Sequence, residues 1–455
     1  MRRYFLPSVF AATIFSVVVF YANCTPDLSV PRPQPGSCDF SKMVAVGGDF
    51  MSGYMDGALS ARGQERSVPA LLARQLMLAG GGSFLQEKIS VSGGLGWNLK
   101  PWESWFVNAS KLGFKTDCQG VNSLMPVWDS LARANAAAEI NSPASGSAQD
   151  FSVPFATMAQ LFSPSLGNYS VSQNTNPYYH RIASNAGTST VIGDAVNVNA
   201  TFFSAWFGME DIYNYAQQGG AGVSIPSAAT FSAYLDSALS RLTQNGAKGV
   251  IANIPDFRDF PYYTLVPWNG AALTQSKADS LNDIYQQAGF MNINFASGNN
   301  GFVIADANAP NGFRQMHGNE YITLSVPVDS LKCDYLGLLF SVMPDRYVLD
   351  SAEVAYLDMN IAAYNSVIAQ KAAQYNLALV DMNSYFRSFV SGIKWDGVNY
   401  NAEFVTGGFF SLDGYHPNEK GDALIANEFI TAINNKFGAT VPTLNCFDCN
   451  GVLFP

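Results

Sequence analysis

Four short apolar runs, separated by long segments of helical periodicity, constrain the fold of this chain most strongly. Residues 43–46, 201–207, 249–254 and 377–381 each have the length and composition of a buried strand. Strands that alternate with amphipathic helices favour a parallel sheet that helices cover on both faces, so we predict an α/β fold. The expected helices span residues 67–79, 226–245, 351–375 and 423–437, and a hairpin is expected at 393–404.

Two long segments interrupt this alternation. Residues 80–180 are rich in Gly, Ser, Asn and aromatic side chains, and residues 256–345 show helical character only near 276–287. A hydrophobic content of 48% over 455 residues is enough for one large core. We predict one domain over residues 41–440 with insertions around 80–180 and 256–345, followed by a tail over 441–455.

The N-terminus has the pattern of a signal peptide. Two arginines precede an apolar run over residues 4–21, which ends shortly before Cys24. A cysteine at this position resembles a bacterial lipoprotein processing site. It predicts that residues 1–23 are removed and that Cys24 becomes lipidated. An uncleaved anchor helix with an incidental cysteine is the alternative.

A lipid on Cys24 implies a membrane partner and an outer-membrane location, on either the periplasmic face or the cell surface. Four prolines within residues 24–40 predict an extended tether between the lipid and the domain. No later apolar run is long enough to span a bilayer, so we expect the lipid to be the anchor.

Charge and cysteine content exclude other classes of partner and cofactor. Charged residues make up 13% of the chain, the net charge is −10, and no basic run follows the N-terminal arginines, so a nucleic-acid partner is not expected. Export permits disulfides, but spacing does not fix their pairing. The CxxC pattern in the tail predicts a local or cross-chain disulfide rather than zinc, and we expect no cofactor. The six cysteines are Cys24, Cys38, Cys118, Cys333, Cys446 and Cys449.

Polar side chains follow two of the predicted strands and precede the last helix. Asp49 comes after the first strand, Glu210 and Asp211 after the second, and Asp413 and His416 lie on a turn that leads into the helix at 423–437. The carboxyl ends of parallel strands meet at one edge of a sheet. A His with a carboxylate three residues away is a proton-transfer pair. The sequence therefore predicts one site at this edge.

Four sequence blocks resemble the SGNH (GDSL-type) esterase and lipase family, in particular its exported Bacteroidetes-type lipoproteins. The blocks are Val44-Ala-Val-Gly-Gly-Asp-Phe-Met-Ser-Gly-Tyr-Met-Asp-Gly57, residues 202–211, residues 252–256 and residues 404–418, which contain Ser411-Leu-Asp-Gly-Tyr-His416. The resemblance implies a three-layer αβα sandwich with a flavodoxin-like parallel sheet. It also implies a site built from a nucleophilic Ser, a Gly and an Asn at the oxyanion hole, and a final Asp-x-x-His.

Only the last pair of family residues is present in this chain. Alignment on Gly53-Tyr54 places Asp49 at the position of the nucleophile, and alignment on Gly48-Asp49 places Phe50 there, so neither alignment gives a Ser. Gln173 stands at the position of the Gly and Glu210 at that of the Asn. Asp413 and His416 match the final pair. Ser52 is too far along the turn to replace the nucleophile. A carboxylate at the oxyanion position repels developing negative charge, and loss of a single donor costs roughly 10²–10³ in rate.

Three separate replacements predict a chain that keeps the fold but has lost its chemistry, with Asp413 and His416 as vestigial residues. We expect an inactive outer-membrane lipoprotein that serves as a binding or scaffold subunit of an outer-membrane protein complex. The alternative is an esterase or acylhydrolase in which Asp49 is the nucleophile and His416 the base.

Two other hypotheses concern the same edge of the sheet. Asp49, Glu210 and Asp413, with His416 nearby, form a candidate cation site, but a simple pair between Asp49 and His416 is the favoured interpretation. Asp211 is expected to pin its loop, and Asp256 is interpreted as a turn residue. An aromatic cluster is expected to pack an insertion against the site rather than to stack a sugar. The cluster consists of Phe257, Phe260, Tyr262 and Tyr263.

Overall fold

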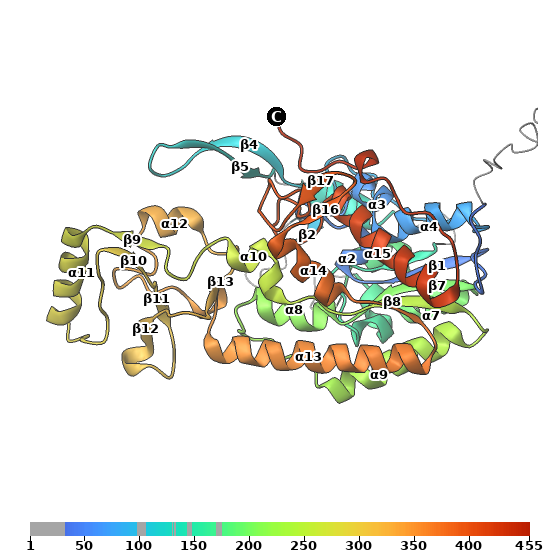
Figure 1. Cartoon of the computed structure of the whole chain (residues 1–455). Helices are drawn as coiled ribbons and strands as arrows, with labels where there is room; N and C mark the ends of the chain where they lie inside the picture. Colours follow the sequence, from blue (N-terminus) through green and yellow to red (C-terminus); the bar gives the residue numbers. More distant parts are fainter. Residues whose placement is uncertain (1–31, 98–105, 130, 132, 143–147, 170–174) are drawn as a thin grey trace, which may run out of the picture. The chain divides into compact units, whose positions relative to one another are not determined.

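The computed structural model describes residues 32–97, 106–129, 131, 133–142, 148–169 and 175–455. Residues 34–455 form one compact unit around a five-stranded sheet with the strand order β15-β8-β7-β1-β6 (Figure 1). All four strand pairs of this sheet are parallel. The strands are β1 (Met43–Gly47), β6 (Asp150–Ser152), β7 (Phe202–Trp206), β8 (Lys248–Ala252) and β15 (Ala378–Val380).

The strands predicted at 43–46, 201–207, 249–254 and 377–381 are confirmed as β1, β7, β8 and β15. Every residue of β1 and β7 is buried. Burial of this kind is expected when helices cover both faces of a parallel sheet, because neither face of a strand then meets water. The apolar runs therefore specified strands without any polar alternation.

Long helices cover the sheet in two layers. α4 (Val68–Leu78) packs on α15 (Glu419–Phe437), and α9 (Ala228–Thr243) packs on α13 (Ser351–Gln374). Figure 1 shows the first pair and the second pair on opposite sides of the strands. The predicted α/β class and three-layer sandwich are thus confirmed.

Local capping explains where these helices begin. Ser67 accepts a hydrogen bond from the N–H of Ala70 at the start of α4. Asp350 caps α13 in a reciprocal capping box with Glu353. Asn418 accepts the N–H groups of Lys420 and Gly421 at the start of α15. Side-chain caps of this type satisfy N–H groups that the helix itself leaves free.

The remaining elements lie between these helices and strands. In the first part of the chain they are α2 (Asp49–Ser52), α3 (Ala61–Glu65), β2 (Gly96–Trp97), β3 (Phe106–Val107), β4 (Lys111–Thr116), β5 (Asn122–Val127), α5 (Arg133–Ile140), α6 (Pro177–Ile182), α7 (Val191–Asn197) and α8 (Met209–Gln217). Later elements are α10 (Pro261–Thr264), β9 (Ala271–Leu273), α11 (Gln275–Gln287), β10 (Gly298–Asn300), β11 (Val303–Ala305), β12 (Phe313–Gln315), β13 (Tyr321–Ile322), α12 (Val328–Cys333), β14 (Val348–Leu349), α14 (Met382–Ser391), β16 (Ile393–Trp395) and β17 (Val398–Tyr400).

The segment 80–180 is more than an insertion. Its residues Asp150–Ser152 form β6, an edge strand of the central sheet that pairs with β1. This strand of the central sheet is not among those predicted from the sequence. β6 has three residues and a single apolar side chain, Phe151, so it lacks the run that identifies a buried strand.

The two long inserted segments are tied to each other. The β4–β5 hairpin carries Cys118 near its tip, and this residue forms a disulfide with Cys333 at the end of α12. Asp117 pairs with Lys332 at 3.1 Å, and Lys115 pairs with Asp329 at 3.4 Å. One covalent bond and two ion pairs thus join elements that lie more than 200 residues apart in the sequence.

The cysteines of the tail do not form the predicted disulfide. Cys446 and Cys449 are both free thiols and both buried. The Nδ2 atom of Asn427 lies 3.7 Å from Cys446 Sγ, and the Nη1 atom of Arg66 lies 3.9 Å from Cys449 Sγ. The prediction of a local disulfide is therefore wrong, because each thiol packs against a different neighbour inside the protein, and the cross-chain alternative stays a prediction.

The signal peptide at 1–23 and the lipidated Cys24 lie outside the described residues, so they stay predictions. Within the described ranges, no helix is both long enough and apolar enough to cross a membrane.

Loss of the disulfide should destabilise the protein. Cys118→Ala with Cys333→Ala frees a loop of 215 residues in the unfolded chain. We expect the free energy of unfolding to fall by about 2–4 kcal/mol, measured by urea denaturation. Reductant should destabilise the wild type and leave the double variant unchanged. Equal stability of wild type and double variant without reductant would contradict this expectation.

Candidate functional site

The sheet brings together side chains from three distant segments. Asp49 is the first residue of α2, directly after β1 and Gly48. Glu210 lies in the first turn of α8, directly after β7. Asp413 and His416 lie on the turn before α15. Because β1 and β7 are parallel neighbours, their carboxyl ends place Asp49 and Glu210 side by side.

Gly48 allows this close approach. A Cβ atom at residue 48 would lie 1.2 Å from Oε1 of Glu210, so no side chain fits there. The absence of a side chain lets the backbone of the strand end reach the carboxyl group. The N–H of Asp49 donates a hydrogen bond of 2.9 Å to Glu210 Oε1.

His416 lies between two carboxylates. Its Nδ1 is 2.8 Å from Oδ2 of Asp413, and its Nε2 is 3.1 Å from Oδ2 of Asp49. The second contact lacks the alignment of a hydrogen bond and is an ion pair. The favoured interpretation, a pair between Asp49 and His416, agrees with this geometry.

Asp413 is fixed by more than the histidine. Its Oδ1 accepts the N–H groups of Tyr415 at 2.9 Å and of His416 at 2.8 Å, and its Oδ2 also accepts the N–H of Gly57 at 3.1 Å. The last contact links the turn before α15 to the segment that follows α2. The carboxylate therefore orients the ring and joins two ends of the chain.

The two carboxylates determine the charge of the ring. Burial alone would lower the pKa of His416, but Asp413 and Asp49 raise that pKa to about 10. Burial would likewise raise the pKa of Asp413, and the neighbouring His416 turns the shift downwards. At neutral pH the ring is an imidazolium that has already bound its proton. A general base has to be unprotonated, so this arrangement disfavours that role for His416.

The pKa of Glu210 shifts in the opposite direction to that of Asp413. Burial, followed by the negative charge of Asp49, raises the pKa of Glu210 well above its ordinary value. Burial and the neighbouring Asp49 therefore disfavour a second negative charge on Glu210. Its Oε1 already accepts the N–H of Asp49, a donor that an oxyanion hole would use.

Aromatic side chains seal the site from water. The rings of Phe50, Tyr54 and Tyr415 lie 5.3, 4.9 and 4.8 Å from the His416 ring. Asp49 and His416 are each 4% exposed, and Glu210 is 5% exposed. A substrate therefore has no open path to these groups unless the surrounding rings move.

The predicted aromatic cluster forms part of this seal. Phe260 lies 5.2 Å from the Tyr415 ring, and the N–H of Tyr262 donates to the carbonyl of Gly414 at 2.9 Å. Phe257 and Tyr263 are buried next to each other. The expectation that this cluster packs an insertion against the site is confirmed.

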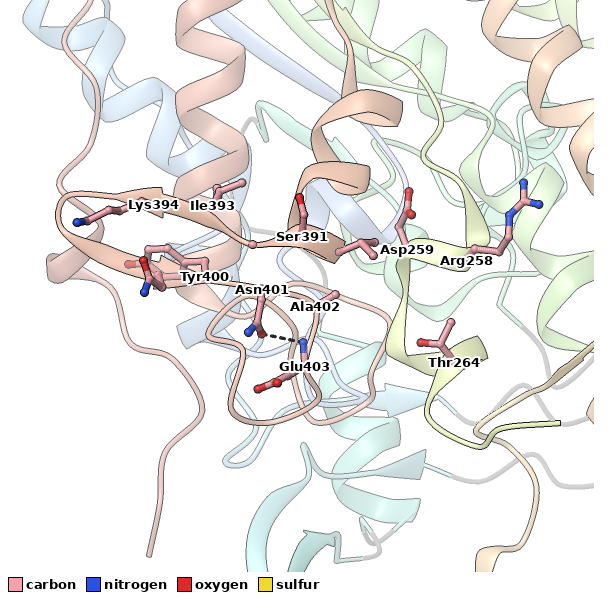
Figure 2. A pocket seen from close by; sticks show the side chains of 13 residues that line it. Arg258, Asp259, Thr264, Ser391, Ile393, Lys394, Tyr400, Asn401, Ala402 and Glu403 are labelled. Carbon is pink, nitrogen blue, oxygen red and sulfur yellow. Dashed lines mark hydrogen bonds between the residues drawn. The ribbon is translucent and has the colours of Figure 1, made fainter. Parts of the chain in front are cut away.

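A surface pocket of about 670 Å³ lies near this region but does not contain the site. Figure 2 shows the polar side chains on its walls, among them Arg258, Asp259, Ser391 and Glu403. Asp49, Glu210, Asp413 and His416 are absent from its lining. The buried site and this pocket are therefore separate features.

The other candidate residues have structural roles. Asp211 accepts the N–H of Met158 at 2.8 Å and so pins a neighbouring loop, as predicted. Asp256 caps a short turn and binds Arg258 and Arg387. Ser52 is buried, and its hydroxyl donates to the carbonyl of Asp49 at 2.8 Å, so it does not replace the nucleophile.

Two further hypotheses concern Gln173 and a cation site. Gln173, assigned to the oxyanion Gly, lies outside the described residues, so that assignment stays a prediction. Among the residues that the structure describes, no set of three His, Cys, Asp or Glu side chains is arranged to hold a metal ion. The structure therefore does not support the candidate cation site at Asp49, Glu210 and Asp413.

Sequence reasoning missed Asp56 and Ser411. The N–H of Asp56 donates to Ser411 Oγ at 3.0 Å, and its carboxyl accepts the N–H of Leu412 at 2.9 Å. Burial is the main reason that the pKa of Asp56 is raised to about 6. Asp56 has a positive φ of 56°, a conformation in which Asp is more common than most side chains. The Met-Asp-Gly turn was the available signal.

A parallel sheet with an Asp-x-x-His turn before its last helix defines an α/β protein of the hydrolase type. A comparison with family models matches GDSL-like Lipase/Acylhydrolase over residues 124–429. This match covers more than half of the chain, so the chain belongs to that family. The matched range includes Glu210, Asp413 and His416 but begins after Asp49.

The other comparisons are weaker. Among solved structures, the chain is similar to an alpha/beta hydrolase enzyme from the metagenome of Lake Arreo, Spain, with 11% identity and a TM-score of 0.26. The similarity covers 53% of this chain and 63% of that protein, which is less than two thirds of its length. It carries no argument about the site. A search of the curated proteins found no match.

The charge of His416 can be measured directly. We expect its ring to titrate near pH 10 in the wild type and at a lower pH in Asp49→Asn, because the variant loses one of the two carboxylates. NMR resolves this titration, since the chain has only three histidines. Titration of His416 in the wild type near its ordinary pKa of 6.5 would contradict the ion pair.

The same shift gives a pH dependence of stability. A pKa raised from 6.5 to about 10 stabilises the fold fully below pH 6.5, and this contribution is lost as the pH rises through 10. The free energy of unfolding should fall over this window, and it should fall less steeply in Asp49→Asn.

Proposed function

We propose that this chain is a non-hydrolytic member of the GDSL family that serves as a binding or scaffold subunit at the outer membrane. The position of Asp49 carries the proposal. A carboxylate stands where the family places its nucleophile, and it pairs with the histidine that would otherwise act as base. The ring then has a carboxylate at each nitrogen and no nitrogen left to accept a proton.

The surroundings of Glu210 support the same conclusion. Its carboxyl oxygen takes up the N–H of Asp49, a group that an active site of this family would need for the oxyanion. Both groups are buried, so water and ester substrates are kept away. The role of Asp413 and His416 in this proposal is to stabilise the fold by joining the turn before α15 to α2.

The disulfide supports export. Disulfides persist in oxidising compartments and are rare in reducing ones, so Cys118–Cys333 fits a secreted or periplasmic chain. Together with the predicted lipid on Cys24, this favours an outer-membrane lipoprotein on the periplasmic face or the cell surface. The predicted tether is shorter than residues 24–40, because the compact domain begins at Gln34 and both Cys38 and Phe40 are buried in it. The residues between Cys24 and Gln34 would hold the domain close to the membrane.

The β4–β5 hairpin supports a role in binding. Within the described residues its two strands pair only with each other, so both outer edges are open. Phe114 and Trp128 on this hairpin are 71% and 63% exposed. Open strand edges and exposed aromatic side chains are features of surfaces that bind another protein. We assign this surface to an outer-membrane protein partner.

An esterase assay separates this proposal from its alternative. We expect the purified wild type to hydrolyse p-nitrophenyl acetate and butyrate no faster than buffer, because His416 is paired with two carboxylates and Glu210 takes up the N–H of Asp49. An active GDSL esterase is the positive control. Turnover by the wild type that is lost in both His416→Ala and Asp49→Asn would show instead that Asp49 is the nucleophile and His416 the base.

Affinity capture from detergent-solubilised membranes tests the partner. We expect the tagged lipoprotein to co-purify with an outer-membrane protein. Phe114→Ser should reduce the recovered partner severalfold. The matched control is Phe447→Ser, which also removes an exposed phenylalanine but lies in the C-terminal tail. Recovery of the wild type as a lone monomer under mild detergent would count against the scaffold role.

A further inference from the structure

A second cavity lies in the segment that follows β8, away from Asp49 and His416. It has a volume of about 740 Å³ and is bounded by β9, α11, α12 and the loops around them. Figure 1 shows these elements grouped together. Gln119, from the tip of the β4–β5 hairpin, closes one side. Volumes of 300–1,000 Å³ are typical of sites for small organic ligands.

The walls of this cavity are mainly aliphatic. The lining includes side chains from four separate stretches, so the apolar surface is continuous around the cavity and not confined to one helix face. Leu265 at the edge is exposed and Phe302 at the base is buried, which gives the cavity an open mouth and a closed floor. The principal apolar side chains are Leu265, Val266, Leu281, Phe302, Leu331 and Leu338.

The charge of the lining is the opposite of the charge of the chain. The protein has a net charge of −10, yet the lining contains two lysines, Lys277 and Lys332, and no Asp or Glu. Lys332 pairs with Asp117. Lys277 makes no ion pair with any residue that the structure describes, so its ammonium is available to a ligand.

The N-terminus of α11 and a nearby hydroxyl group also favour the binding of an anion. Lys277 lies in the first turn of α11, a helix of 13 residues, and its N–H donates to Thr274 at the N-cap. The first turn of a helix favours negative charge. The hydroxyl of Ser276 also lines this part of the cavity, whereas that of Ser280 donates to the carbonyl of Ser276. An anionic group at the mouth would therefore meet one cation, a helix N-terminus and one hydroxyl.

We propose that this cavity binds a single unbranched acyl chain with a carboxylate head, that is, a fatty acid. The aliphatic walls take up the chain, and Lys277 binds the carboxylate. Burial of methylene groups supplies most of the binding free energy, at roughly 0.8 kcal/mol for each CH₂. The disulfide holds one wall in place, because Cys118 is the neighbour of Gln119 and Cys333 that of Lys332.

Isothermal titration calorimetry with sodium dodecanoate, below its micelle concentration, tests the site on the disulfide-bonded protein. We expect saturable binding of one dodecanoate per chain. Lys277→Glu should weaken this binding at least tenfold, because the carboxylate then meets a like charge. The variant should fold, since Glu is favoured in the first turn of a helix. Dodecyltrimethylammonium should bind Lys277→Glu more tightly than it binds the wild type.

Two further variants make the result specific. Ser280→Trp places an indole at an exposed position of the lining and should reduce dodecanoate binding at least tenfold by filling the cavity. Lys42→Glu makes the same change of charge at an exposed lysine outside the lining, and it should bind dodecanoate like the wild type. Melting temperatures close to that of the wild type would show that each variant is folded.

Three results would overturn the proposal. The first is the absence of saturable dodecanoate binding to the wild type. The second is equal affinity of Lys277→Glu and Lys42→Glu for dodecanoate, which would remove the role of the cation. The third is unchanged affinity in Ser280→Trp, which would place the ligand outside this cavity.

Discussion

The ion pairs of one buried histidine join two segments of this protein that lie far apart in the sequence. His416 contacts Asp413 on its own turn and Asp49 at the end of the first strand. A buried charge is costly unless opposite charges and hydrogen bonds compensate it. Here the imidazolium and two carboxylates compensate one another, and Glu210 accepts the N–H of Asp49. These contacts join the turn before α15 to the start of α2.

This arrangement is the basis of our proposal that the chain keeps the fold of its family without the chemistry. A serine at the position of Asp49 would leave the histidine free to bind and release a proton, whereas a carboxylate favours the protonated ring. In this proposal the three residues stabilise the structure and do not react. Aromatic rings then close over the site, which an enzyme would have to keep open. We therefore propose that the function of this chain lies on the surfaces formed by its two long inserted segments.

Those surfaces are built from the two long segments between the core strands. The disulfide between Cys118 and Cys333 joins these segments, so the hairpin β4–β5 is covalently linked to a wall of the cavity beside α11. The lining of the cavity carries Lys277 and no Asp or Glu, in a chain that is acidic overall. The hairpin exposes aromatic side chains beside open strand edges. We interpret the cavity as a site that contacts a ligand and the hairpin as a site that contacts a partner protein.

The sequence by itself determined the core strands, the long helices and the residues gathered at the sheet edge. Apolar runs, helix caps and the Asp-x-x-His turn are local signals, and parallel strands carry Asp49 and Glu210 to one edge by rule. The tertiary structure decided what local signals cannot encode. It decided the short edge strand at Asp150–Ser152, the free thiols of the tail, and the pairing of cysteines 215 residues apart. It also decided the charge of His416, because that charge depends on which carboxylates the fold places at each nitrogen.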